Sequence, residues 1–247
     1  MIPEALDGKR LFVTGTTGFL GTALLERLLR SVPGCEVVLL VRPGKRSTVE
    51  QRARKEIFHN DCFDRLRDEL GGTGAAGGRN TGPFEEMVAR RVQVVAGDVS
   101  RDGLGLDDAG RAALARCDTV IHSAAAVSFD SPLDGAVEVN LLGPTRIAHT
   151  LHSLGVAPHL VAVSTCYVAG NRRGAAPERL LRDQPFSIDV DWRREVDAAR
   201  RARTDAEDAS RTPENLARFA KEARHELGAA GMPLLADKGE QRRTAWV

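Results

Sequence analysis

One glycine-spaced segment, residues 14–21, restricts the fold of this chain more than any other. It reads Thr-Gly-Thr-Thr-Gly-Phe-Leu-Gly, so its three glycines have the spacing GxxGxxG. The apolar run 10–14 before the turn predicts a buried strand, and the leucine stripe of residues 18–31 after it predicts a helix packed on a sheet. A glycine turn in that context is typical of a nucleotide-binding βα unit, although plain strand–helix turns also contain glycines.

Further apolar runs predict four more buried strands, at residues 36–41, 91–96, 118–122 and 159–164. Helical patterns separate them at 49–70, 107–115 and 132–154, the last with Ser131 as N-cap and Pro132 as its first residue. This alternation predicts an α/β fold with a parallel, doubly wound sheet, the Rossmann fold. The glycine-rich residues 71–82 are expected to form a surface loop inserted before the third strand.

The composition changes after residue 170, which suggests a boundary between two domains. We expect a dinucleotide-binding domain over residues 1–170 and a loop with a charged helical appendage over 171–247. Residues 191–228 are rich in Ala, Arg, Asp and Glu, and predict one or two solvated helices that break where Thr212 can cap a new helix. The arginines between 193 and 203 are interpreted as a solvated face, with a lid or partner surface as the alternative.

The charge balance and cysteine pattern exclude several classes of protein. Lys and Arg total 35 against 34 Asp and Glu, which gives no basic field for nucleic acid or an anionic membrane. No apolar run approaches the roughly 18 residues of a membrane span, and the N-terminus lacks the pattern of a signal peptide. The four cysteines form no CxxC pair. We therefore expect a cytoplasmic protein with reduced thiols, and leave a homo-oligomer open.

Each glycine of the turn has an expected role in binding a diphosphate. Gly15 would permit the tight turn, Gly18 would let the diphosphate approach the backbone, and Gly21 would let the helix lie close to the strand. The free N–H groups and the dipole of the helix would face the anion.

The ends of three other strands carry residues suited to the rest of a dinucleotide. Arg42, followed by Lys45-Arg46, suits a 2′-phosphate, so NADP(H) is favoured over NAD(H), with a solvated basic turn as the alternative. Asp98 and Val99 could hold adenine, although Asp98 could equally cap a turn. The small residues 124–126 would let the middle of the cofactor cross the strand ends, or would simply pack closely.

Six segments then identify a family resemblance: TGTTGFLG, VVLLVRP, GDVS, IHSAAAVSFD, VNLLGPTRIA and VSTCYVAG. They resemble the N-terminal reductase domain of fatty acyl-CoA reductases, which are extended short-chain dehydrogenases/reductases related to thioester-reductase domains. The resemblance covers residues 8–170. It implies that NADPH delivers hydride to a fatty acyl thioester, carried by coenzyme A or a carrier protein, to give an aldehyde or an alcohol.

The resemblance also assigns residues to roles. Those implied for the diphosphate are Gly15, Thr17, Gly18, Phe19, Leu20 and Gly21. Those implied for the rest of the cofactor are Arg42 for the 2′-phosphate, Asp98 and Val99 for adenine, and Ala124, Ala125 and Ala126 for its centre. Thr165 matches the catalytic hydroxyl residue, with Ser164 beside it. Asn140 matches a helix asparagine of the superfamily or is a backbone-bonding residue. No metal site is expected.

The chain departs from the family at the catalytic pair, a Tyr followed four residues later by Lys. Tyr167 is the only tyrosine, and Asn171 stands four residues after it. We therefore expect a chain cut short before the catalytic helix, with little turnover alone, because a missing proton donor lowers rates by roughly 10²–10⁴-fold. The alternatives are another extended short-chain reductase, such as a nucleotide-sugar epimerase or dehydratase, and a non-catalytic NADP-binding or scaffold protein.

Overall fold

The computed structural model describes residues 2–44, 47–71, 82–128, 132–168, 173–183, 190–228 and 231–247. These residues fall into two compact units. The first comprises Met1–Ser131 and Glu138–Pro177, and the second comprises Pro132–Val137 and Glu178–Val247.

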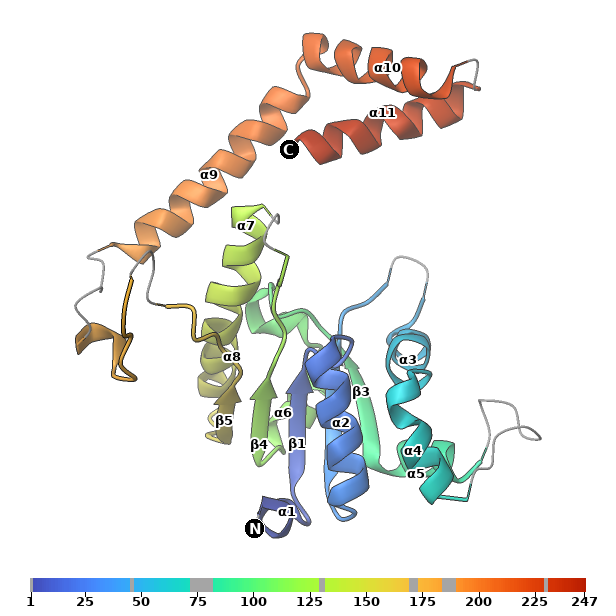
Figure 1. Ribbon diagram of the computed structural model, residues 1–247, viewed down its shortest axis with the longest axis vertical. Helices are drawn as coiled ribbons and strands as arrows, with labels where there is room; N and C mark the ends of the chain where they lie inside the picture. Colours follow the sequence, from blue (N-terminus) through green and yellow to red (C-terminus); the bar gives the residue numbers. More distant parts are fainter. Residues whose placement is uncertain are drawn as a thin grey trace. The chain divides into compact units, whose positions relative to one another are not determined.

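The first unit is built on a five-stranded parallel sheet with the strand order β3-β2-β1-β4-β5 (Figure 1). The strands are β1 (Arg10–Thr14), β2 (Glu36–Val41), β3 (Val92–Ala96), β4 (Thr119–His122) and β5 (His159–Ala162). This order confirms the doubly wound α/β fold that the sequence predicts. It also places the topological switch point between β1 and β4, because the chain fills the sheet on one side of β1 before it crosses to the other.

Alternating side chains of the strands enter two separate apolar clusters, which explains why the strands read as continuous apolar runs. Leu11 and Val13 of β1 pack with Leu25 of α2 (Phe19–Ser31). Phe12, between them, packs with Leu114 of α6 (Asp108–Ala115) and with Ile147. Helices therefore cover both faces of the sheet, as in other parallel sheets.

The predicted helical region 49–70 is not one helix. It consists of α3 (Val49–Ala53), the π-helix η1 (Arg54–Phe58), the 3₁₀ turn η2 (Asp61–Phe63) and α4 (Asp64–Glu69). The break falls at Asn60, whose side chain accepts a hydrogen bond from the Cys62 amide (2.9 Å) and so starts a new turn. An additional helix, α5 (Pro83–Arg91), precedes β3, and most of the predicted surface loop, residues 72–81, lies outside the described residues.

The helix expected from Pro132 begins one residue later. Pro132 has extended backbone angles (φ −53°, ψ 137°) and stands at the N-cap of α7 (Leu133–Ala136), while Ser131 lies outside the described residues. A π-helical segment, η4 (Val137–Leu141), and α8 (Leu142–Ser153) follow. Two short elements, α1 (Ile2–Leu6) and η3 (Asp102–Gly105), complete the first unit, whereas α7 and the 3₁₀ turn η5 (Leu181–Asp183) belong to the second.

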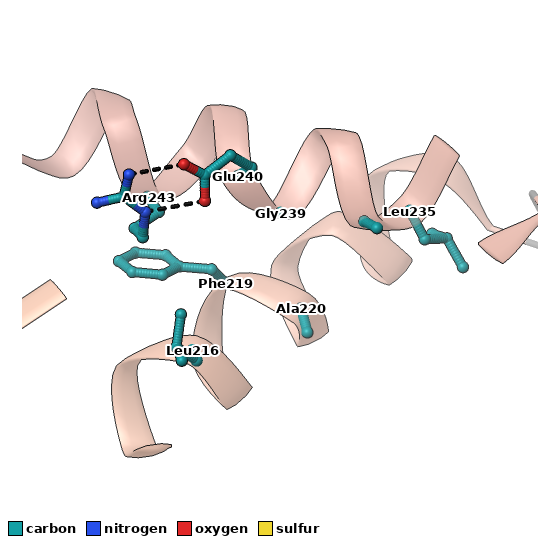
Figure 2. Close-up of a pocket in the computed structure, with 8 residues that line it drawn as sticks. Leu216, Phe219, Ala220, Leu235, Gly239, Glu240 and Arg243 are labelled. Carbon is teal, nitrogen blue, oxygen red and sulfur yellow. Dashed lines mark hydrogen bonds and ion pairs between the residues drawn. The ribbon is translucent and has the colours of Figure 1, made fainter. Parts of the chain in front are cut away.

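The second unit contains α9 (Trp192–Ser210), α10 (Pro213–Leu227) and α11 (Met232–Trp246). The predicted break is confirmed, since Thr212 Oγ1 accepts a hydrogen bond from the Asn215 amide (3.4 Å). α10 and α11 line an open pocket of about 190 Å³ beside the paired Arg243 and Glu240 (Figure 2). α11 is not predicted from the sequence. Its apolar residues do not gather on one face, so they give no helical pattern.

Candidate functional site

The first glycine of the turn is held against the end of β4. Gly15 has a φ of +79°, in the left-handed region that favours glycine. A Cβ atom there would lie 2.5 Å from the Ala124 nitrogen and 2.6 Å from the Ser123 carbonyl carbon. The turn then closes through the Gly18 amide, which donates to the Gly15 carbonyl (3.0 Å). Gly15 therefore lets the chain leave β1 in contact with the backbone that leaves β4.

The start of α2 is anchored on the same turn. Thr22 Oγ1 hydrogen-bonds the carbonyls of Thr16 (2.8 Å) and Gly18 (2.9 Å). Gly18 is the N-cap, and no side chain caps it. The first-turn amides of a helix lack intrahelical partners, so this end of α2 is suited to an anion. Residues 17–20 are exposed, with Phe19 94% exposed, whereas Gly21 is buried.

Three hydrogen bonds join the last residue of β1 to the last residue of β4 and the two residues after it. Thr14 Oγ1 lies 2.8 Å from His122 Nδ1 and accepts a hydrogen bond from the Ala124 amide (3.3 Å). The Ser123 hydroxyl donates to the Thr14 carbonyl (2.8 Å). Thr14, His122 and Ser123 are not predicted as site residues from the sequence, although Thr14 and His122 each stand as a polar residue at the end of an apolar run.

Arg42 lies exposed at the end of β2, as expected from the sequence, and Lys45 and Arg46 lie outside the described residues. Its carbonyl accepts a hydrogen bond from Arg52 Nη1 (2.6 Å). Arg52 Nε also donates to Glu56 (2.9 Å), and this bond lowers the pKa of the Glu56 carboxyl. Within the described ranges, no hydrogen bond or ion pair engages the Arg42 guanidinium, so its charge is available to a ligand.

Asp98 and Val99 follow β3, and each has a structural role there. Asp98 Oδ1 accepts hydrogen bonds from the amide (2.9 Å) and the hydroxyl (2.7 Å) of Ser100, which is the turn-forming role that the sequence left open. Val99 is 6% exposed and lies in the apolar cluster on the α6 and α8 face, next to Gly143. Its side chain is thus committed to the core, which leaves mainly its backbone for a ligand.

The alanines after β4 lie nearest to the glycine turn. Ala124 and Ala126 are half-buried and Ala125 is exposed. The Asn140 side chain accepts a hydrogen bond from the Ala126 amide (2.8 Å) and donates to the Ala126 carbonyl (2.9 Å). Asn140 therefore has the backbone-bonding role, and it fixes the path of this segment from the π-helical η4.

Ser164 and Thr165 are exposed beyond the end of β5. Thr165 Oγ1 accepts a hydrogen bond from the Tyr167 amide (3.0 Å), and the Tyr167 side chain is 86% exposed. A threonine hydroxyl that accepts from an amide keeps its own hydrogen to donate. The structure therefore brings Gly15 and Ala124 together, and it places Arg42, Asp98 and Thr165 at the carboxyl ends of three other strands.

Residues 13–223 match the model of a family described as Male sterility protein. The chain belongs to this family. It is 30% identical to "Fatty acyl-CoA reductase 8" of Arabidopsis thaliana over 77% of this chain and 38% of that protein. It is 34% identical to "Fatty acyl-CoA reductase 1" of Gallus gallus over 70% of this chain and 31% of that protein.

A solved structure is similar to this chain in its fold. The terminal R domain of the myxalamid PKS-NRPS pathway matches with a TM-score of 0.50 and 27% identity, over 68% of this chain and 37% of that one. The chain thus spans less than half the length of these relatives. Its α/β unit is that of the N-terminal domain of a fatty acyl-CoA-reductase-like extended short-chain reductase, which confirms the resemblance and implies a nicotinamide dinucleotide cofactor. Across the part of the chain that the structure describes, no helix combines the length and apolar character needed to cross a bilayer.

Proposed function

We propose that this chain binds NADPH and forms the cofactor-binding part of a reductase for fatty acyl thioesters, carried by coenzyme A or an acyl-carrier protein. The observation that carries the proposal is the glycine turn at the switch point. There the start of α2 has no side-chain cap, and the exposed residues 17–20 lie beside the Gly15–Ala124 contact that joins the ends of β1 and β4. Open α/β sheets bind nucleotides at this position.

The residues present fit such a cofactor. Gly18 and the amides of residues 19–21 would hold the diphosphate, because a side chain does not cap them and the helix dipole favours negative charge. Asp98 would offer Oδ2 to the adenine amino group, since Oδ1 is engaged by Ser100. The half-buried Ala124 and Ala126 would form the floor under the centre of the cofactor.

We propose NADPH rather than NADH because of Arg42. An NAD site usually has an acidic residue at the end of the second strand, where it binds the ribose hydroxyls. Here the exposed residue that follows the second strand is Arg42, and a guanidinium pairs well with a phosphate.

For the reaction, NADPH supplies a hydride when bound, and this chain supplies a hydroxyl. Thr165, with Ser164 beside it, would donate a hydrogen bond to the oxyanion that forms at a thioester carbonyl. The 247 residues contain no Tyr-x-x-x-Lys to deliver a proton there. We therefore expect these residues to bind the cofactor with little turnover.

Calorimetric titration of the chain with NADPH tests the proposal. We expect saturable heat from the wild type, and loss of that heat in Gly18→Val, whose side chain would obstruct the diphosphate. Gly135→Ala is a matched control, because a Cβ at Gly135 has no atom within 4 Å. A folded wild-type chain that gives no heat at saturating NADPH would overturn the proposal.

The missing Tyr–Lys pair also favours a second candidate, a non-catalytic NADP-binding or scaffold protein. The two differ in turnover. Incubation with NADPH and palmitoyl-CoA, followed at the nicotinamide absorbance band, should show slow oxidation for a partial reductase and none above the buffer rate for a scaffold.

A further inference from the structure

His122 lies at the centre of the hydrogen bonds that join the strand ends under the glycine turn. It ends β4 in register with Thr14, the end of β1, and its backbone carbonyl accepts a hydrogen bond from the Val163 amide (2.8 Å). Both side chains are buried, Thr14 at 1% and His122 at 4% exposed. The Thr14 Oγ1 to His122 Nδ1 distance of 2.8 Å therefore describes a hydrogen bond shielded from water.

The direction of that hydrogen bond follows from counting hydrogens. The Ala124 amide can only donate, so Thr14 Oγ1 is its acceptor (3.3 Å). The Thr14 hydroxyl hydrogen then needs an acceptor, and within the described residues His122 Nδ1 is the one in contact with it. All three groups are satisfied if Nδ1 carries no hydrogen, which means a neutral ring with its hydrogen on Nε2.

Protonation of the ring would disturb this arrangement. An Nδ1–H group would place two donors, itself and the Ala124 amide, on one hydroxyl oxygen, and the Thr14 hydroxyl hydrogen would lose its acceptor. A buried polar group without a partner is destabilising. The affected atoms include the Ala124 amide, which lies against Gly15, so the strain would fall on the turn itself.

We propose that His122 is a positioning residue: its neutral ring, by accepting the Thr14 hydroxyl, fixes the Gly15 turn and the Ala124 backbone for the dinucleotide, and its protonation weakens dinucleotide binding. The inference rests on the proposed function, since it concerns the same site. His122 itself acts through Thr14.

The surroundings of the ring support a neutral state. Its neighbours in register are uncharged, Thr14 on β1 and Ala162 on β5. On its own face of the sheet lie apolar residues of the second cluster: Phe12 and Val120 on the strands, Leu114 on α6, and Ile147 and Leu151 on α8. Burial among them lowers the pKa of His122, and no charged side chain of the described residues contributes to the shift.

Replacement by asparagine separates positioning from simple packing. In His122→Asn, the side-chain oxygen can accept the Thr14 hydroxyl as Nδ1 does, but it cannot take up a proton. In His122→Leu, the volume is retained and the acceptor is lost. His149→Asn is the control, because His149 is exposed on α8. A second pair, Thr14→Ser and Thr14→Ala, keeps or removes the hydroxyl with a smaller change to the core.

The experiment is calorimetric titration with NADPH from pH 8 to pH 5, with thermal melting to establish that each variant is folded. At pH 8 we expect His122→Asn and Thr14→Ser to bind nearly as the wild type does, and His122→Leu and Thr14→Ala to bind about tenfold more weakly. On acidification, the wild-type Kd should rise relative to that of His122→Asn. This ratio removes the titration of the cofactor phosphate, which is common to both. If His122→Leu does not fold, the affinities of Thr14→Ser and Thr14→Ala test the inference in its place.

Nitrogen NMR of the free protein gives a reading that does not depend on the cofactor. We expect the His122 ring to carry its hydrogen on Nε2 at pH 8, and an Nδ1–H form would overturn the inference. Equal affinities of His122→Leu, Thr14→Ala and the wild type would also overturn it while leaving the proposed function standing. A folded wild type that binds no NADPH would instead overturn the proposed function, and the inference with it.

Discussion

A Cβ atom on Gly21 would lie 2.2 Å from the carbonyl oxygen of Gly15, well inside contact distance. The helix α2 thus rests directly on the turn, whereas a Cβ atom on Gly18 would meet only the Gly15 carbonyl oxygen, at 3.3 Å. The two glycines therefore serve different purposes. Gly21 is required by the fold, and under the proposed function Gly18 is required mainly by the dinucleotide.

This difference predicts opposite outcomes for two alanine substitutions. Gly21→Ala should lower the free energy of unfolding by about 1–3 kcal/mol or more, because the methyl group overpacks the turn. Gly18→Ala should fold with nearly the wild-type stability and bind NADPH more weakly. Thermal melts and calorimetric titration, with Gly135→Ala as control, measure both effects. Equal loss of stability in the two variants would contradict this division of roles.

Arg42 predicts a selective effect on the phosphorylated cofactor. Arg42→Gln should weaken NADPH binding by about 10- to 100-fold, the range expected when a hydrogen bond to a charged group is lost, and leave NADH binding unchanged. Arg27→Gln, which removes an exposed charge from α2, is the matched control. If both cofactors weakened together, Arg42 would act on the fold or the diphosphate and not on the 2′-phosphate.

The sequence predicts the sheet well because its signals are local. The strands 10–14 and 36–41 have the predicted bounds, since each apolar run ends where the strand leaves the core. The break at Asn60 is not predicted, because a single side-chain hydrogen bond outweighs a helical pattern there. β5 stops at Ala162, before the predicted Ser164, because its partner β4 ends at His122.

The site is predicted only as far as single segments reveal it. The glycines stand in one contiguous turn and can be read directly. The bond between Thr14 and His122 joins residues 108 positions apart, and it depends on the register of two parallel strands. Val99 shows the opposite limit: its place after a strand suggests a ligand contact, but packing against α8 buries its side chain.

The four cysteines are all unpaired, and they predict a simple reactivity pattern. Cys62 and Cys166 are exposed, while Cys35 and Cys117 are buried. Burial also raises the pKa of Cys117 to about 11, which leaves very little thiolate at neutral pH. A thiol reagent should therefore modify two cysteines in the native chain and four after denaturation. Rapid reaction of all four would contradict the native packing.

Under the proposed function, NADPH should slow the reaction of Cys166, which follows Thr165, and leave Cys62 unaffected.

The ion pairs of Arg243 predict that the second unit loses stability in acid. Its side chain is 8% exposed and bonds Glu240 through Nε (2.9 Å) and Nη2 (2.6 Å), as Figure 2 shows, and Glu207 of α9 through Nη1 (2.9 Å). These bonds lower the pKa of both carboxyls. A carboxyl whose pKa is lower in the folded chain binds protons more readily when unfolded, so its stabilising effect is present at neutral pH and is lost as the pH falls through and below the usual glutamate pKa of about 4.3.

We therefore expect the thermal stability of the α9–α11 helices to hold from neutral pH down to about pH 5 and to fall as the pH is lowered through and below about 4.3, where the unfolded carboxyls take up protons first. The fluorescence of Trp246, whose ring centroid lies 6.0 Å from that of Phe219, reports this transition in a Trp192→Phe background. Arg243→Met should melt earlier at pH 7 and show a weaker dependence on pH, because the arginine that lowers both pKa values is gone. Arg224→Met, which removes an exposed arginine from α10, should keep the wild-type profile. The same pH dependence in Arg243→Met and the wild type would show that these ion pairs do not link α11 to α9.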